Sequence, residues 1–234
     1  MFEHKGVDVR VEGVSKRYQM AAEEVHALRE SSWEVRRGEA VAIMGPSGCG
    51  KTTLLNLLGG VDRPTTGKIV IDGEDLAQMS ERALEKHRLL RVGFVFQFFN
   101  LIPSITALEN LELPMVMAGV GESECRRRAK ALLGLVDLEA KGQKRPEELS
   151  GGVQQRVAVA LALANDPALI LADEPTGNLD STNAAAIARL LASLAIDHGK
   201  TVIMVSHDAK TVELFPTVHA MRDGRFVDDA PPVA

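Results

Sequence analysis

A glycine-rich stretch of eight residues constrains this chain more than any other feature of its sequence. Residues 45–52 read Gly-Pro-Ser-Gly-Cys-Gly-Lys-Thr, with an apolar run at 40–44 before them and a helix-like run at 53–58 after them. Glycines let the backbone curl until successive N–H groups converge on an anion, and a helix that starts there adds partial positive charge. The stretch therefore predicts a phosphate-binding loop between a buried strand and a helix, which is the P-loop arrangement.

The spacing of this loop gives its residues expected roles. We expect Lys51 to reach the β- and γ-phosphates of a nucleotide and the Thr52 hydroxyl to ligate Mg²⁺. ATP is favoured over GTP because no Asn-Lys-x-Asp guanine-reading motif occurs in the chain. The residues expected to contact ATP here are Gly45, Pro46, Ser47, Gly48, Cys49, Gly50, Lys51, Thr52 and Thr53. A thiol at a helix N-terminus usually has a lowered pKa, so we hypothesise that alkylation of Cys49 blocks nucleotide binding and that ATP protects it. The alternative is that Cys49 is only a small residue that fits the loop.

Two carboxylates follow a second apolar run. Residues 169–172 are Leu-Ile-Leu-Ala, and Asp173 and Glu174 come directly after them. Burying carboxylates at a strand end is unfavourable unless a positive charge accompanies them, and a magnesium ion with its waters supplies that charge. We expect Asp173 to orient the metal shell and Glu174 to polarise the attacking water of ATP hydrolysis. His207 follows a third apolar run and is placed where it can contact the γ-phosphate.

The pattern of apolar residues predicts an α/β fold. Continuous apolar runs at 40–44, 168–172 and 201–205 are typical of parallel strands covered on both faces. Alternation from residue 7 to 12, and again at 32–35 and 69–71, indicates half-buried strands of an antiparallel sheet. The section from 98 to 164 is mostly helical, with helices expected at 122–133 and 153–164. We therefore expect a P-loop NTPase core with a mostly parallel sheet, an N-terminal antiparallel β subdomain and a helical insertion.

The domain organisation follows from the same pattern. Residues 1–234 are expected to form a single ATPase domain, with an α/β core made of 1–97 and 165–227. Residues 98–164 are the predicted helical subdomain, and 228–234 are predicted to be a flexible tail.

Composition narrows the possible partners. The 234 residues carry a formal net charge of -5 with basic and acidic residues well mixed, which argues against a protein that mainly binds nucleic acid. The basic cluster at 126–130 is interpreted as a solvated helix face. The two cysteines have no metal or disulfide spacing, and no window is apolar enough for a signal peptide core or a membrane span. We expect a cytoplasmic chain without direct membrane insertion, so a membrane role requires a partner.

A second motif carries a family resemblance. Residues 149–152 read Leu-Ser-Gly-Gly and are followed by Val-Gln-Gln-Arg at 153–156, which resembles the signature of the nucleotide-binding subunit of ABC transporters. Ser150 is expected to cap a helix, while Gly151 and Gly152 expose N–H groups at its positive end. The resemblance implies that this surface contacts ATP held by a second copy of the chain, so that two chains enclose two ATP molecules.

The resemblance runs from about Val7 to Val227 and assigns further residues. It implies that Tyr18 stacks on adenine, that Gln97 touches Mg²⁺ and relays to an integral membrane permease, and that His207 is the switch histidine. The Asn178–Asp180 segment resembles the loop through which dimer partners communicate, with Asp180 near the nucleotide. Residues 96–103 and 172–180 are similar to the lipoprotein-release and macrolide-export branch, whose partner is a four-helix permease. Location on the inner face of the cell membrane follows from that partner.

Two positions depart from the family pattern, and a short apolar cluster suggests a docking surface. Val153 stands where Gln or Glu is common and Leu161 where Arg is usual, so polar contacts around the signature helix, and dimer tightness, are expected to differ. The residues expected to face the permease are Phe98, Phe99, Leu101 and Ile102, with Phe99→Asp predicted to weaken docking but spare ATP binding. The alternative is that these residues pack in the core of the helical section.

Two other functions stay open on the sequence. One is a regulatory ATPase that gates a membrane partner without transport. The other is a soluble ABC ATPase acting on DNA or ribosomes, which is disfavoured because the chain has one cassette and no sustained heptads between Lys51 and Asp173. The transported substrate is read by the permease, so the sequence does not name it.

Overall fold

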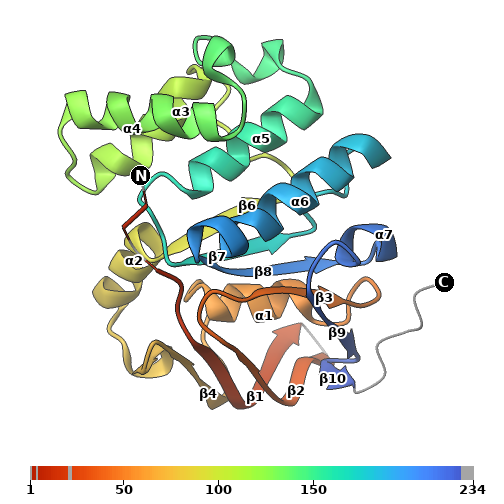
Figure 1. Ribbon diagram of the computed structural model, residues 1–234. Coiled ribbons are helices and arrows are strands. Elements are labelled where there is room, and N and C mark those ends of the chain that lie inside the picture. Colours follow the sequence, from red (N-terminus) through yellow and green to blue (C-terminus); the bar gives the residue numbers. More distant parts are fainter. Residues whose placement is uncertain (1, 4, 21–22, 228–234) are drawn as a thin grey trace.

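The computed structural model describes residues 2–3, 5–20 and 23–227, and it has two lobes. The predicted flexible tail lies outside the described residues. The lower lobe in Figure 1 contains the strands and the helix α1, and the upper lobe contains the helices α3, α4 and α5. α6 lies between them, along the upper face of the larger sheet.

The larger sheet has six strands in the order β10-β9-β3-β8-β7-β6. β3, β6, β7, β8 and β9 pair in parallel, and only β10 is antiparallel to its neighbour β9. The strands are β3 (Ala40–Met44), β6 (Val92–Phe96), β7 (Leu169–Asp173), β8 (Thr201–Ser206), β9 (Thr217–Arg222) and β10 (Arg225–Val227). The mostly parallel sheet expected from the sequence is confirmed, and the three predicted apolar strands are β3, β7 and β8.

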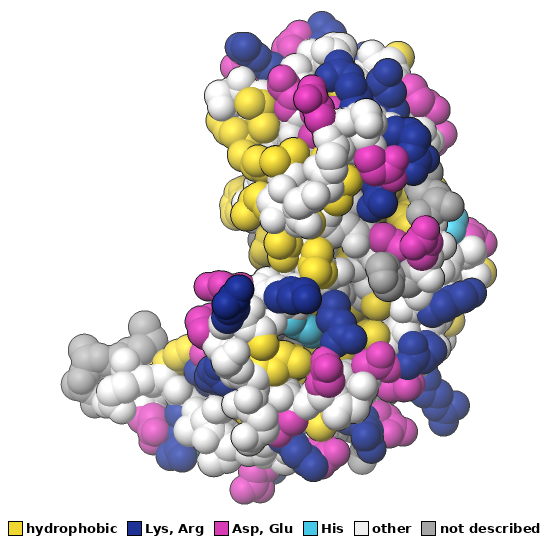
Figure 2. Space-filling model, turned by 90° about the vertical axis from the view of Figure 1, so that its left-hand side faces the viewer, with side chains coloured by type: hydrophobic (Ala, Val, Ile, Leu, Met, Phe, Trp, Pro, Cys, Tyr) yellow, Lys and Arg dark blue, Asp and Glu magenta, His cyan; other side chains and the backbone are white. Residues whose placement is uncertain are grey.

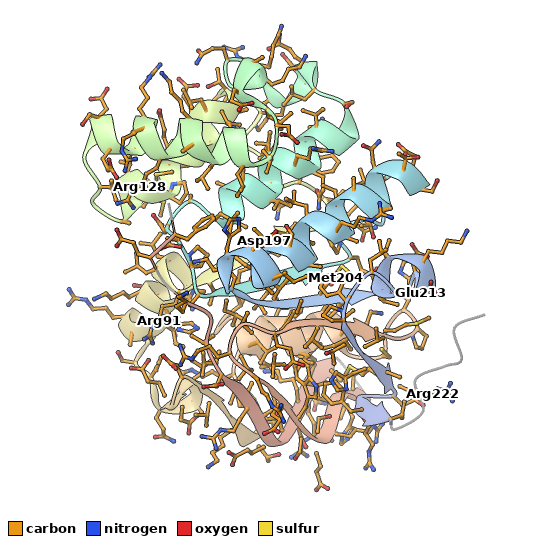
Figure 3. All side chains as sticks on the ribbon, viewed as in Figure 1. Arg91, Arg128, Asp197, Met204, Glu213 and Arg222 are labelled. Carbon is orange, nitrogen blue, oxygen red and sulfur yellow. The ribbon has the colours of Figure 1, made fainter. Side chains whose placement is uncertain are left out.

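The central strands have continuous apolar runs because both of their faces are covered. On β8, Val202 and Met204 belong to the core beneath α6, while Ile203 and Val205 belong to the core around α1. Figure 3 labels Met204 between β8 and α6. A strand that faces solvent on one side would need polar residues at every second position, so the absence of alternation is the physical signature of this two-sided burial.

The smaller sheet is antiparallel, with the order β2-β1-β4-β5. It consists of β1 (Val9–Met20), β2 (Glu23–Val35), β4 (Thr66–Ile71) and β5 (Glu74–Asp75). The antiparallel subdomain expected near the N-terminus is confirmed. β1, β2 and β4 are longer than the segments predicted at 7–12, 32–35 and 69–71, since each continues beyond the alternating apolar positions.

The helices complete the two lobes. They are α1 (Lys51–Leu58), α2 (Glu81–Leu90), α3 (Ala107–Met117), α4 (Glu122–Leu135), α5 (Gly151–Ala162), α6 (Ser181–His198) and α7 (Ala209–Val212), with 3-10 turns η1 (Leu76–Gln78), η2 (Glu139–Lys141) and η3 (Pro146–Glu148). The helix predicted at 122–133 extends two residues further, and the one predicted at 153–164 starts and ends two residues earlier. Residues 98–106 form a loop before α3. In the part of the chain that is described, no helix is both long and apolar enough to cross a membrane.

Candidate nucleotide site

The predicted phosphate loop connects the end of β3 to the start of α1. Gly48 and Gly50 have φ angles of 79° and 107°, a region that side chains other than glycine rarely adopt. A Cβ built on Gly50 would lie 2.3 Å from the Ala27 carbonyl oxygen, and one on Gly45 would lie 2.3 Å from that of Met221. The glycines are therefore required both for the backbone path and for the close approach of neighbouring backbone.

Lys51 is the first residue of α1, and its amino group is almost fully buried. It donates to the carbonyl oxygens of Gly45 (2.8 Å) and Pro46 (3.1 Å), and it lies 3.4 Å from Glu174 Oε1. These contacts hold a buried positive charge inside the curled loop. An anion cradled by the loop would meet this charge directly.

Thr52 and Asp173 meet beside this lysine. The Thr52 hydroxyl donates to Asp173 Oδ1 at 3.1 Å, although 121 residues separate the two in sequence. Burial, followed by the neighbouring Glu174 carboxylate, raises the pKa of Asp173 in spite of the nearby Lys51 charge. Hydroxyl and carboxylate oxygens are the ligands that Mg²⁺ prefers. The charge of the ion would offset the free-energy cost of burying an ionised carboxylate. The pair thus fits the predicted metal position.

Glu174 points back into the site because of its backbone conformation. Its φ is 47°, in the left-handed region, which costs an ordinary residue about 1 kcal/mol. One carboxylate oxygen faces Lys51, and the other accepts from the backbone N–H of His207 (3.2 Å) and lies 2.9 Å from His207 Nδ1. The strand ends of β3, β7 and β8 therefore bring together the lysine, the two acids and the histidine predicted from separate motifs.

The signature segment starts α5, but its serine does not act as expected. Ser150 occupies the N-cap position, yet its side chain makes no capping hydrogen bond, so that part of the prediction is wrong. α5 also has no acidic residue in its first turn. Among the described helices of eight or more residues, only α1 and α5 have neither a side-chain capping hydrogen bond at the N-terminus nor an acidic residue in the first turn. These two helices leave their positive ends for an external anion.

Gln97 and Asp180 lie at the junction between the lobes. β6 and β7 pair Phe96 with Asp173, so Gln97 and Glu174 leave the sheet at the same edge. The Gln97 amide packs against Gly177, where a Cβ would lie 2.9 Å from its Nε2. Asp180 caps α6 by accepting from the N–H groups of Thr182 and Asn183, both at 3.0 Å.

Tyr18 lies on β1 and is anchored to the start of the loop after α1. Its hydroxyl donates to Asp62 Oδ2 at 2.8 Å, and the Lys16 amino group lies 4.9 Å from the ring centroid. Burial, followed by the Asp62 carboxylate, raises the pKa of the Tyr18 phenol. The stacking of adenine on this ring stays a prediction.

The structure contradicts the reactive-thiol hypothesis for Cys49. Its side chain is buried, and burial raises the pKa of the thiol above its ordinary value, outweighing the nearby Lys51 charge. A Cβ on Gly45 would lie 2.7 Å from the Cys49 Sγ, so the sulfur fills the inside of the loop. A buried thiol with a raised pKa is a poor nucleophile, and Cys49 is better explained as a small packing residue.

The expected docking cluster is divided by the structure. Phe98 is 71% exposed, whereas Phe99 is half-buried and its ring lies 3.6 Å from the position of a Cβ on Gly151. Phe99→Asp is therefore a poor test of docking, because it would disturb the start of α5. Exposed apolar residues continue on α3, and together this lobe presents Phe98, Ile102, Leu113, Val116 and Met117. Figure 2 shows hydrophobic side chains gathered along one edge of the upper lobe.

The two departures from the family pattern are packing residues. Val153 and Leu161 are both half-buried and lie against the core that α5 shares with α3 and α4. Their apolar side chains are therefore accommodated within the lobe. Whether they change the affinity between two chains stays a prediction.

A cavity of about 740 Å³ lies at the opposite end of the sheet from the phosphate loop. Its lining includes Arg37, Arg91 and Ala168, which precede β3, β6 and β7, whereas the loop and Glu174 follow β3 and β7. Figure 3 labels Arg91 beside α2, and Figure 2 shows the hollowed face on that side. A five-residue strand is about 16 Å long, so this cavity is separate from the nucleotide site.

Comparison with known proteins decides the family. Residues 28–177 match the profile of the ABC transporter family. The chain belongs to that family. It is the ATP-binding subunit of an ABC transporter, an ATPase that uses ATP with Mg²⁺. An ABC transporter ATP-binding protein of Thermotoga maritima is 52% identical over 213 residues, 91% of each chain. The lipoprotein-releasing system ATP-binding protein LolD of Chromohalobacter salexigens is 43% identical over 229 residues, 98% of this chain and 97% of that one.

Solved structures support the same assignment for this ABC ATPase. The ATP-binding cassette MJ0796 of Methanocaldococcus jannaschii is 44% identical over 220 residues, 92% of this chain and 94% of that one. Its dimeric post-hydrolysis structure with ADP and Pi superposes with a TM-score of 0.85 at 43% identity, covering 93% of this chain and 96% of that chain. The expected fold and the similarity to the lipoprotein-release branch are thereby confirmed.

Sequence reasoning missed two contacts of this site. Asp62, which holds Tyr18 and accepts from Lys16 at 2.7 Å, gave no signal because its partners lie more than 40 residues away. Asn183 donates to Asp180 Oδ2 at 2.6 Å. The Asp-Ser-Thr-Asn run at 180–183 is typical of a helix start and was a local signal for this second contact.

Proposed function

We propose that this chain works as one of two identical ATPase subunits that close over two ATP molecules and drive a separate membrane permease of the lipoprotein-release or macrolide-export kind. The observation that carries this proposal is the pair of uncapped, acid-free helix starts at α1 and α5. Figure 1 places α1 in the lower lobe and α5 in the upper lobe. Because the N-termini of α1 and α5 lie on different lobes, they suit a site shared between two chains. One chain would supply its α1 N-terminus to the phosphates and the other its α5 N-terminus.

The residues of the lower lobe then divide the chemistry. The phosphate loop, Gly45 to Thr53, cradles the phosphates, and Lys51 turns from the loop carbonyls towards the γ-phosphate. Thr52, Asp173 and the Gln97 amide would hold Mg²⁺, and that ion would supply positive charge next to the phosphates. Glu174 accepts the proton of the attacking water. His207 steadies that carboxylate and contacts the γ-phosphate.

The upper lobe completes the partner's site. Ser150, Gly151 and Gly152 present their N–H groups to the ATP bound by the second chain, and Asp180 lies beside the same boundary. Tyr18 stacks on adenine. We treat 1–97 and 165–227 as the core and 98–164 as the lobe that moves with the signature.

The membrane partner docks on the exposed apolar residues of the upper lobe. Phe98 follows Gln97 directly and Ile102 lies in the same loop, so a permease held there is coupled to the metal-binding edge of the site. The chain is accordingly placed on the inner face of the cell membrane, held by its permease. The MJ0796 dimer supports the two-chain arrangement, and the LolD relative supports a lipoprotein-release partner.

The test is the oligomeric state of Glu174→Gln, measured by light scattering during size-exclusion chromatography with and without Mg-ATP. The amide keeps the shape of Glu174 but cannot take a proton from water, so ATP stays bound and the closed dimer accumulates. We expect a monomer without nucleotide and a dimer with Mg-ATP.

Matched controls make the result specific. Lys51→Ala in the same background should abolish the dimer, because the phosphates lose their buried cation. A Glu174→Gln chain that binds ATP but stays monomeric would contradict the shared site.

A further inference from the structure

Asn183 joins the two segments that meet at the boundary between chains. It lies in the first turn of α6, directly after the Asn178–Asp180 segment, and it faces the start of α5. We propose that Asn183 is a positioning residue that locks the signature glycines to Asp180, so that the two segments reach the partner's ATP as one rigid unit. This inference rests on the proposed two-chain site.

The first contact is a hydrogen bond to a charged group. Asn183 Nδ2 donates to Asp180 Oδ2 at 2.6 Å, while the other oxygen of that carboxylate accepts from the N–H groups of Thr182 and Asn183. The backbone and side-chain hydrogen bonds from Asn183 hold the pKa of Asp180 below its ordinary value. The carboxylate is thereby fixed in one orientation and fully ionised at neutral pH.

The second contact is steric. With Nδ2 turned to Asp180, Asn183 Oδ1 faces α5, and a Cβ built on Gly152 would lie 2.5 Å from it. Gly152 is buried, so it has no free space in which to accommodate a side chain. The second signature glycine is therefore required in this chain because the Asn183 amide occupies the place of its side chain.

Neighbouring contacts extend the same unit. A Cβ on Gly151 would lie 3.6 Å from the Phe99 ring and 3.8 Å from Leu179. The Asn178 amide donates to the Gln97 carbonyl oxygen at 3.1 Å. The loop after Gln97, the Asn178–Asp180 segment and the signature thus converge on the start of α5, and Asn183 is the side chain that supplies both a hydrogen bond and a close contact there.

The experiment measures dimer affinity in the Glu174→Gln background, by sedimentation in Mg-ATP. Asn183→Ala removes both contacts and should weaken dimerisation by up to about tenfold, because the hydrogen bond that holds the Asp180 carboxylate in place is lost. ATP affinity of the monomer should change little, because the phosphate loop is untouched. Thr182→Ala, an exposed neighbour on the same turn, is the matched control and should behave like the parent.

Asn183→Asp separates the two contacts. It keeps the shape that faces Gly152 but places a second carboxylate beside Asp180, so dimerisation at neutral pH should fall at least as far as in Asn183→Ala. Lowering the pH protonates the new carboxyl group and restores a donor, so the dimer affinity of this variant should approach that of the parent measured at the same pH. A residue that only stabilises the fold would give no such pH-dependent recovery in dimer affinity.

The outcomes distinguish the inference from its premise. If Glu174→Gln itself fails to dimerise with ATP bound, the proposed function fails. If it dimerises and both Asn183 variants dimerise with the parent affinity, the positioning role of Asn183 is overturned. If Asn183→Ala also lowers the melting temperature, the pH dependence of Asn183→Asp is the deciding measurement. A dimer affinity of Asn183→Asp that does not recover at low pH then rejects the positioning role of Asn183.

Discussion

Burial shifts the pKa values of several side chains in this protein. His87 on α2 is 3% exposed, and neither ring nitrogen has a hydrogen-bond partner among the described residues. Burial, followed by the nearby Arg91 charge, lowers the pKa of His87 to about 4. Burial raises the pKa values of Cys49 and Asp173 instead, because their charged forms are anions and burial disfavours the charged form.

We predict that His87 makes the fold sensitive to acid. The unfolded histidine titrates near its ordinary value of 6.5, whereas the folded one stays neutral down to about 4. Unfolding therefore takes up a proton between these values, and stability present above pH 6.5 is lost as the pH falls towards 4. The shift corresponds to at most about 3 kcal/mol, at 1.36 kcal/mol per unit.

Urea unfolding at pH 5 and pH 7 measures this effect. In His87→Leu, the difference in free energy of unfolding between the two pH values should be smaller than in the parent. Replacing the exposed His26 by Ala serves as the control. An unchanged difference in His87→Leu refutes the assignment.

Among the elements, α3 has an unusual division of faces. Leu108, Leu111 and Met115 are buried in the upper lobe, while Leu113, Val116 and Met117 are exposed. The start of α3 is fixed by a capping box between Thr106 and Glu109. A well-anchored helix with exposed apolar residues is typical of a partner surface.

We predict that charges on this face release the chain from the membrane. Phe98→Asp and Val116→Asp should each shift the chain from the pellet to the supernatant when source-cell membranes are sedimented. Stability should change by less than about 0.5 kcal/mol, because both side chains are exposed. Ile196 on α6 is 74% exposed and lies outside this surface, so Ile196→Asp is the matched control and should stay in the pellet. Retention of Phe98→Asp in the pellet counts against docking there.

The whole molecule is two lobes joined through contacts that lie outside the catalytic residues. The Asn165 amide donates to the carbonyl oxygens of Leu89 on α2 and Pro114 on α3, both at 3.0 Å. Asn178 ties the loop after β6 to the segment before α6. The core beneath α6 is also continuous with that of the upper lobe, so each chain is one packed unit. A ligand that engages two such chains adds contacts between them and should stabilise the assembly.

We predict that ATP stabilises Glu174→Gln in a manner that depends on protein concentration. Binding to a single chain raises stability by about 2.7 kcal/mol at a hundredfold excess over Kd, whatever the protein concentration. Closure of two chains adds a term that grows with concentration. Melting temperatures in Mg-ATP should therefore rise on concentrating the protein, and Lys51→Ala should show neither effect. A concentration-independent shift argues for a nucleotide site formed by one chain.

The sequence by itself determined the parts of this protein that depend on contiguous residues. The phosphate loop, the three apolar strands and the helix predicted at 122–133 follow from local spacing and composition, and the signature at 149–152 carried the family. The tertiary structure alone decided how distant segments meet. It gave Cys49 a raised pKa by burying it, turned Phe99 inwards, and brought Asn183 against Gly152. The burial of Cys49 and the contact between Asn183 and Gly152 depend on residues far apart in the chain, which local pattern does not identify.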